Sequence, residues 1–315
     1  MFNQNNTIMP ETKKYFGMGW VRDYPDFRDY SPERDAITDA RKKMGEKMTI
    51  QKMLKQAGLN EKKQATEKDK IDLCHWCSPI EDQESIGSCT ANAGAGLLEF
   101  FEKRAFGKYT DASRLFLYKT TRNLMKLKGD TGAYLRTTMQ AMRLFGVLPE
   151  EYWEYDIDKY DEEPPSFCYS YAQNYQSINF YRLDGNGIKG EALLERIRWF
   201  LNANLPSMFG FTVFRSIAQA NETGAIPFPG FNDKVAGGHA VMAVGYDNKK
   251  KIKNMWDSQT LETVGAIKIR NSWGKNWGEH GYGWLPYEYI RQGLAVDWWS
   301  LIDNEWVDSD RFKEV

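Results

Sequence analysis

Three residues that lie far apart in the sequence carry the side chains that a cysteine nucleophile needs. Cys89 lies in the segment QESIGSCTA, where it would begin a helix. His239 begins the apolar run HAVMAVGY, and Asn271 follows a second apolar run in RNSWGKNWG. A thiol at a helix N-terminus is favoured as thiolate, an imidazole can take and return its proton, and an amide can orient the imidazole. Together these residue types predict nucleophilic catalysis on sulfur.

Each of these residues, taken alone, has a structural explanation. A small cysteine packs well in a Gly- and Ala-rich helix start, and a histidine at a strand start can be an internal hydrogen-bonding group. An asparagine before Ser-Trp-Gly can simply form a turn. The combination of all three, in this order, favours the catalytic interpretation.

The elements that must position these residues divide the chain into two halves. Apolar residues repeat at helical spacing over residues 89–105, 113–127, 134–145 and 191–202, and Ser88 is placed to cap the first helix. Short runs of β-branched and aromatic residues predict strands at 208–214, 240–246, 265–270 and 282–285. We therefore expect an α+β fold with a helical lobe, a β-rich lobe and a cleft between them.

The composition indicates a folded protein with balanced charge. The 315 residues are 42% hydrophobic and 14% aromatic, which is enough to bury a core. Lys and Arg total 42 against 43 Asp and Glu, so a nucleic-acid partner is not expected. The sequence has no apolar run long enough for a membrane span and no apolar segment near its start. We expect no membrane partner and a cytoplasmic location, with export by a route without a signal peptide left open.

Residues 1–70 differ from the rest and are expected to form an N-terminal extension. Residues 31–70 contain 11 Lys or Arg, 7 Asp or Glu and no aromatic residue, so they either pack on the remainder or stay solvated. Residues 17–30, GMGWVRDYPDFRDY, are expected to lie as an extended strap against a domain. The main domain is placed at 71–306, with a helical lobe at about 71–170, a β-rich lobe at about 171–290 and a C-terminal strap at 291–306. A tail follows at 307–315.

The three motifs resemble those of the papain-like (C1 family) cysteine peptidases, in the prokaryotic-type branch. The Gln-x5-Cys helix start, the Gly-His-Ala-Val strand and the Asn-Ser-Trp-Gly turn occur in that order, and the resemblance spans roughly residues 72–306. It implies a papain-like two-lobed fold with a helical lobe and a β-barrel-like lobe. It also implies cleavage of peptide or protein substrates, in the manner of an endopeptidase, without a metal or organic cofactor.

The resemblance implies a role for each catalytic residue. Cys89 would be the nucleophile, and His239 the general base and then the general acid, ideally stored with the thiol as a thiolate–imidazolium pair. Asn271 would orient the His239 ring, and Trp273 would shield their contact from water. The side-chain N–H of Gln83 would join the Cys89 backbone N–H in an oxyanion hole.

Substrate-binding residues follow from the same resemblance. Gly132 and Ala133, in the stretch KGDTGAYL, would pair with the substrate main chain. Ala133, Tyr134 and Ala240 would border the main specificity pocket, and Trp277 would line the leaving-group side. The alternative for this stretch is a helix N-terminal turn in which glycine allows close packing.

The sequence also departs from the family pattern. Ile86 and Asp130 stand where many secreted relatives have a disulfide, which is consistent with a reduced compartment. Asn271 lies 182 residues after Cys89, beyond the usual range of about 130–150, and the polar stretch 247–263 is the expected insertion, as an enlarged hairpin loop.

The remaining cysteines and two other functions stay open at this stage. Cys74 and Cys77 resemble a redox or zinc half-site, but two ordinary thiols are favoured because only Cys168 remains as a further thiol ligand. A non-catalytic peptide-binding module, or an acyltransferase or deamidase using the same thiol, would share the motifs. Residues 1–70 are predicted to occlude the cleft in part and so to inhibit the enzyme.

Overall fold

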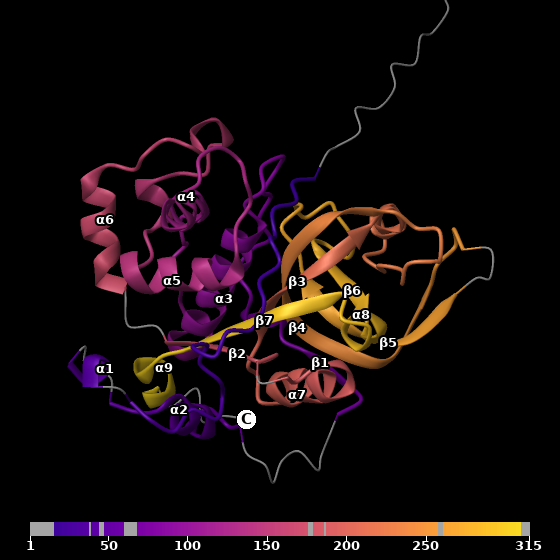
Figure 1. Ribbon diagram of the computed structural model, residues 1–315, viewed down its shortest axis with the longest axis horizontal. Coiled ribbons are helices and arrows are strands. Elements are labelled where there is room, and N and C mark those ends of the chain that lie inside the picture. The colour runs from indigo at the N-terminus through magenta and orange to yellow at the C-terminus, as the bar shows by residue number, and fades with distance from the viewer. Residues whose placement is uncertain are drawn as a thin grey trace, which may run out of the picture.

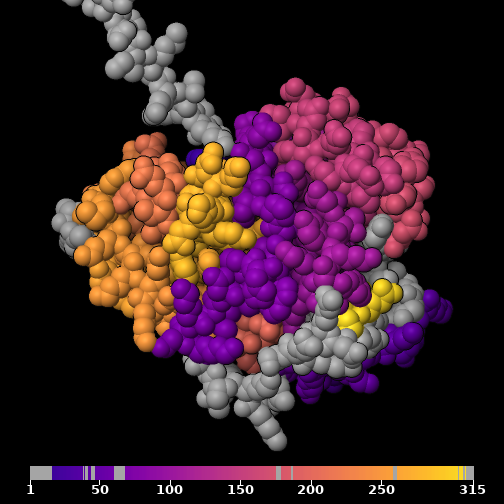
Figure 2. Space-filling view, turned by 180° about the vertical axis from the view of Figure 1, so that it is seen from behind, coloured from indigo at the N-terminus to yellow at the C-terminus, as the bar shows by residue number. Residues whose placement is uncertain are grey.

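A computed structural model describes residues 16–37, 39–43, 47–59, 68–175, 179–185, 187–257 and 261–309. Within these ranges a helical lobe and a lobe built on an antiparallel sheet lie side by side (Figure 1). Seen from behind in Figure 2, the violet stretch of chain that precedes α3 lies between the orange-to-yellow sheet lobe and the magenta-to-rose helices. None of the described helices is long and apolar enough to cross a membrane.

The helical lobe is organised around α3 (Cys89–Phe106), which is buried along most of its length. α4 (Arg114–Met125) and α5 (Leu135–Phe145) pack on α3, and α6 (Ser166–Ala172) lies outside them in Figure 1. Gly94 permits the close approach of α3 and α5, since a Cβ there would lie 3.1 Å from Thr138. The helices expected in this lobe are therefore confirmed. The expected cap is wrong, because the Ser88 hydroxyl bonds the Tyr155 hydroxyl at 2.6 Å and accepts no backbone N–H of the first turn.

The second lobe contains an antiparallel sheet in the order β2-β7-β3-β4-β5-β6, with β1 paired to β4. Its strands are β1 (Lys70–Asp72), β2 (Asn179–Arg182), β3 (Ser207–Phe214), β4 (Val235–Lys253), β5 (Glu262–Arg270), β6 (Tyr282–Pro286) and β7 (Ala295–Ile302). α7 (Gly190–Asn202) and α8 (Tyr287–Arg291) pack beside the sheet. In the described part of the chain β2 and β6 do not pair, so the sheet is open and the expected barrel-like closure is absent.

Two expected irregular segments are strands. Residues 291–306, expected as a C-terminal strap, contain β7, which lies between β2 and β3. Every β7 residue except Val296 is buried, so the strand lacks the alternation that would reveal it in the sequence. The insertion at 247–263 also extends the sheet, because β4 and β5 continue as a hairpin that pairs Lys253 with Glu262.

The N-terminal extension has two structural parts. α2 (Ile50–Gln56) buries Ile50, Met53 and Leu54 in the main core beside β7 and α9 (Asn304–Asp308), and the short α1 (Asp39–Lys43) precedes it. Residues 16–37 are extended for the most part, and their first residues run between the two lobes as the indigo trace of Figure 1. We call residues 16–29 the strap. The extension is therefore integral to the fold.

Candidate active site

Cys89 lies where the two lobes meet. It is the first residue of α3, and its side chain is fully buried. Its Sγ accepts a hydrogen bond from the backbone N–H of Ala240 on β4, at 3.4 Å. The sulfur therefore touches the residue that follows His239, and the fold brings the first two motifs together.

His239 and Asn271 form the second contact of the site. His239 Nε2 lies 2.8 Å from Asn271 Oδ1, which also accepts the backbone N–H of Ser272. Because that oxygen is an acceptor, Nε2 carries the ring proton and Nδ1 has a free lone pair. Within the described residues Nδ1 is buried without a hydrogen-bond partner. The ring stacks on Trp273, with centroids 4.5 Å apart, so the indole covers the imidazole as predicted.

Gln83 is held beside this group by the Asn-Ser-Trp turn. Its Oε1 accepts the Ser272 hydroxyl at 2.5 Å, which fixes the orientation of the amide. Its Nε2 donates to Ile86 O at 2.9 Å and to Gly17 O at 3.0 Å. Trp273 Nε1 also donates to Gly17 O, at 3.3 Å. The donor predicted for an oxyanion hole therefore holds a peptide carbonyl of the strap.

The strap pairs with both walls of the site through its main chain. Ala133 N–H donates to Gly19 O at 2.7 Å, and Val21 N–H donates to Ala133 O at 3.0 Å, which is a parallel bridge. Trp20 N–H donates to Gly238 O at 3.2 Å on the opposite wall. A peptide backbone therefore already lies across the site, between the helical lobe and the sheet.

The predicted substrate-binding residues take different places around the strap. Gly132 is required there, because a Cβ on it would lie 2.2 Å from Gly19 O. Ala133 makes the main-chain pairing described above, and Ala240 binds the sulfur instead of the strap. Tyr134 is half-buried at the start of α5, and Trp277 is buried edge-on against Trp273, 5.4 Å away.

In this covered state burial disfavours the charged forms of both the thiol and the imidazole. Burial raises the pKa of the Cys89 thiol to about 11, although the N–H groups of Ala240 and Gly19 oppose the shift. Burial also lowers the pKa of His239 to about 4, against the opposing effect of Asn271. Burial therefore opposes both charges of the thiolate–imidazolium pair that the sequence led us to expect. Ionising either group would cost desolvation energy that the contacts of the covered site do not offset.

Asp130 has a structural role that the sequence did not reveal. Its Oδ1 accepts the backbone N–H of Gly87 at 2.8 Å and the Tyr118 hydroxyl at 2.5 Å. These bonds tie the loop before Cys89 to the loop before α5. Hydrogen bonds thus connect the two loops at the positions where a disulfide was noted as absent.

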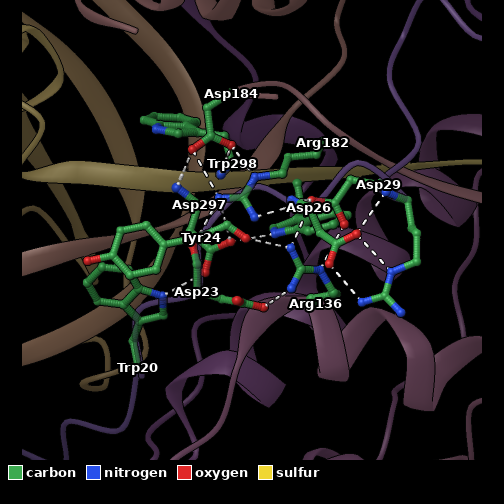
Figure 3. Close-up of polar contacts among 12 residues, drawn as sticks. Trp20, Asp23, Tyr24, Asp26, Asp29, Arg136, Arg182, Asp184, Asp297 and Trp298 are labelled. Atoms are coloured by element: carbon green, nitrogen blue, oxygen red, sulfur yellow. Dashed lines mark hydrogen bonds and ion pairs between the residues drawn. The ribbon is translucent and has the colours of Figure 1, made fainter. Parts of the chain in front are cut away.

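A cluster of aspartates and arginines, also missed from the sequence, anchors the strap (Figure 3). Arg136 of α5 binds Asp29 through Nε and Nη2, both at 2.8 Å, and pairs with Asp23. Arg182 of β2 bonds Asp184 at 2.8 Å and donates to Asp23 O at 3.1 Å. The repeated acidic residues of the strap were the signal in the sequence for such a cluster. Their arginine partners could not be identified from it, because they lie far away in the sequence.

The other thiols are not assembled with the site. Cys74, Cys77 and Cys168 are free, and burial raises the pKa of each of them. His280 is exposed in a turn and is not part of the site. Among the described cysteines, Cys89 is the one whose sulfur contacts the residue that follows His239.

Comparison with known proteins identifies the family. The Papain family cysteine protease (Peptidase_C1) pattern matches residues 65–294. An uncharacterized peptidase C1-like protein of Acanthamoeba polyphaga mimivirus is 34% identical over 226 residues, which cover 70% of this chain and 68% of the relative. Cathepsin K of Gallus gallus is 29% identical, over 66% of this chain and 54% of its own length.

A solved structure extends the comparison to nearly the whole chain. Xylellain, a cysteine protease from Xylella fastidiosa, superposes with a TM-score of 0.68 at 29% identity. The superposition covers 94% of this chain and 99% of xylellain, so the similarity includes much of the N-terminal extension. Sequence, fold and geometry agree that this chain belongs to the papain family of cysteine proteases.

Proposed function

We propose that the chain is a cysteine endopeptidase and that the strap keeps it latent. The thiolate of Cys89 attacks a peptide carbonyl carbon after His239 Nδ1 has taken the thiol proton. The carbonyl π-bond breaks as the sulfur–carbon bond forms, and the negative charge collects on oxygen. The carbon–nitrogen bond then breaks, and His239 returns the proton to the leaving amine. Water, deprotonated by the same ring, cleaves the sulfur–carbon bond and releases the acid.

Three features support these roles. The N-terminus of α3 supplies partial positive charge at the sulfur, and Asn271 fixes the tautomer that leaves Nδ1 free. Gln83 Nε2 donates a hydrogen bond to a peptide carbonyl oxygen of the strap. The observation that carries the proposal is this carbonyl, Gly17 O, which belongs to a peptide that crosses the site beside Cys89.

The path of the strap supports internal cleavage. It runs from Phe16, which stacks on Trp273 at one side of the site, to Asp29, which Arg136 binds beyond the other side. A site that accepts a chain passing through it does not require a free terminus on the substrate. We therefore assign an endopeptidase rather than an exopeptidase.

The strap keeps the enzyme latent in two ways: it occupies the substrate-binding positions, and it disfavours ionisation of the catalytic residues. The strap fills the backbone-binding positions at Ala133 and Gly238, so a substrate cannot pair there at the same time. It also excludes the water that would let the thiol and imidazole ionise. Displacing the strap is therefore the activating step, and α2 can remain in the core during it.

Casein cleavage by a strap-weakened chain tests this function. The full-length Gly19→Ala variant is expected to cleave casein at internal bonds, because a Cβ at Gly19 would lie 1.8 Å from Gly87 O and the strap cannot stay seated. Adding Cys89→Ala should abolish cleavage, whereas adding Cys168→Ala, which removes a buried thiol elsewhere, should not. Cleavage that survives Cys89→Ala would refute the assignment.

A further inference from the structure

The side chain of Trp20 fills a pocket made by the absence of side chains on two strands. Trp20 is 8% exposed. A Cβ on Gly210 of β3 would lie 1.9 Å from Trp20 Cε2, and one on Gly238 of β4 would lie 2.9 Å from Cε3. Both glycines are therefore needed for a large ring to enter.

This pocket lies close to the sulfur of Cys89. The N–H of Gly19, the residue before Trp20, points at the Cys89 sulfur. Trp20 itself bonds Gly238 O, next to His239, and bridges to Ala133. A substrate that replaces the strap between these walls has this pocket available for one of its side chains.

Asp297 forms the polar base of the pocket (Figure 3). It is fully buried on β7, and its Oδ2 accepts the Trp20 indole N–H at 3.1 Å. Its Oδ1 accepts Trp299 Nε1 at 2.7 Å and lies 3.3 Å from Arg182. The backbone of Asp297 has φ of +64°, a left-handed conformation that costs energy for a residue other than glycine. Oδ1 is thus bound by Trp299 and Arg182, and Oδ2 faces the side chain that occupies the pocket.

The charges around Asp297 favour a neutral donor over a cation. When the strap leaves, Arg136 and Arg182 lose Asp23 and Asp29 as partners. Arg182 still lies 2.8 Å from Asp184 and 3.3 Å from Asp297, so Asp297 already has a cationic partner, and Arg136 is left without the two carboxylates that it binds now. A third cation from a substrate would gain little there, whereas an uncharged N–H donor satisfies Oδ2 without adding charge.

We propose that this pocket is the substrate subsite for a tryptophan side chain and that Asp297 is its specificity-determining residue. The inference rests on the proposed function, since it treats the strap as occupying the path of a substrate. A ring of similar shape without an N–H would leave Oδ2 buried and unpaired. Sites of this kind reject such analogues strongly, and we expect discrimination of about 10- to 100-fold.

The test compares two peptidyl vinyl sulfones that differ in one atom. One carries tryptophan and the other 3-benzothienylalanine, in which sulfur replaces the indole N–H, at the first, second or third residue before the electrophile. The rate of Cys89 modification is measured by mass in the full-length Gly19→Ala protein. The displaced Trp20 competes equally with both probes, so their rate ratio is unaffected. At one of the three positions the tryptophan probe should react about 10- to 100-fold faster.

Two substitutions connect that ratio to Asp297. Asp297→Gly removes the acceptor and accepts a φ of +64°, so the ratio should fall to about 1. Asp297→Asn keeps the shape and tolerates this backbone, and it should lower the ratio at least about threefold by removing the charge. Leucine probes, which do not use the acceptor, report whether each variant still has a reactive Cys89.

The outcomes separate this inference from the function it rests on. A ratio near 1 at all three positions, or one unchanged in both Asp297 variants, overturns the subsite while leucine probes still label Cys89. The subsite is also overturned if the sole effect of Asp297→Gly is to make Cys89 more reactive in the full chain with its native strap. Asp297 would then bind the strap and would not contribute to substrate specificity. Absence of labelling by every probe would refute the proposed function as well.

Discussion

The alanine substitution at Gly19 is the smallest change that should open the site. Gly19 lies against the loop before Cys89, and a Cβ there would overlap Gly87 O at 1.8 Å. Since the contact is with backbone, no side chain can rotate away to relieve it. The strap must shift, and water then reaches Cys89 and His239.

The size of the effect follows from the thiol pKa. In the covered state it is about 11, against an ordinary value of 9.0. Returning to the ordinary value raises the thiolate fraction at pH 7 about 100-fold. The nucleophilicity of the thiolate falls as its pKa falls, with a Brønsted slope of about 0.5, which removes about tenfold. The net gain in reactivity is about tenfold, and improved access adds to it.

Alkylation by iodoacetamide at pH 7, followed by the mass of the peptide that contains Cys89, measures this gain. Gly19→Ala should react at least about tenfold faster than the native chain. The native rate should also continue to rise with pH toward about 11, because its thiol remains protonated below that value. Gly185→Ala is the matched control, because a Cβ there meets nothing within 4 Å. Equal rates for the native chain and a folded Gly19→Ala variant would refute the covered-site account.

Three further outcomes follow from the contacts of the site. Arg136→Ala should speed alkylation of Cys89 in the native strap background, because it removes the ion pairs to Asp23 and Asp29; an unchanged rate would show that these pairs do not hold the strap. Gln83→Ala, in the Gly19→Ala chain, should lower kcat/KM for peptides about 10²–10³-fold, and a loss below threefold would remove Gln83 from the oxyanion hole. Asp130→Ala should lower the free energy of unfolding in urea by about 1–3 kcal/mol, since two donors lose their acceptor; an unchanged urea midpoint would contradict that role.

The catalytic constellation was predictable because each member has a local signal. Cys89 begins a periodic helical segment, and His239 and Asn271 border apolar strand segments. Chain order and residue type were enough to propose that they meet, and their contacts through Ala240 and Asn271 Oδ1 agree with that. The positions of the four predicted helices were also accurate, because their apolar residues repeat at helical spacing.

The elements that were missed depend on contacts across long sequence separations. β7 contains Asp297 and two tryptophans and lacks a regular apolar–polar alternation, since the strand is buried on both faces. The role of Asp297 depends on Trp20, which lies 277 residues away. No local pattern reports such a pair.

The charge state of the site could not be predicted from motifs either. A cysteine at a helix start with a histidine partner favours ionisation, and the sequence interpretation followed that rule. In the structure, burial outweighs the backbone N–H donors around the sulfur, so the pKa of Cys89 rises. Which effect dominates depends on how residues 16–21 pack, and that is a property of the tertiary fold.

A trapped acyl-enzyme tests the central claim most directly. The Gly19→Ala chain is mixed with a peptide substrate, quenched in acid within milliseconds to seconds, and analysed by intact mass and peptide mapping. We predict a mass increase equal to the acyl half of the substrate, located on Cys89, that decays as the product acid appears. Turnover of the peptide with Cys89 unmodified at every quench time, and undiminished when Cys89 is replaced by alanine, would contradict the account.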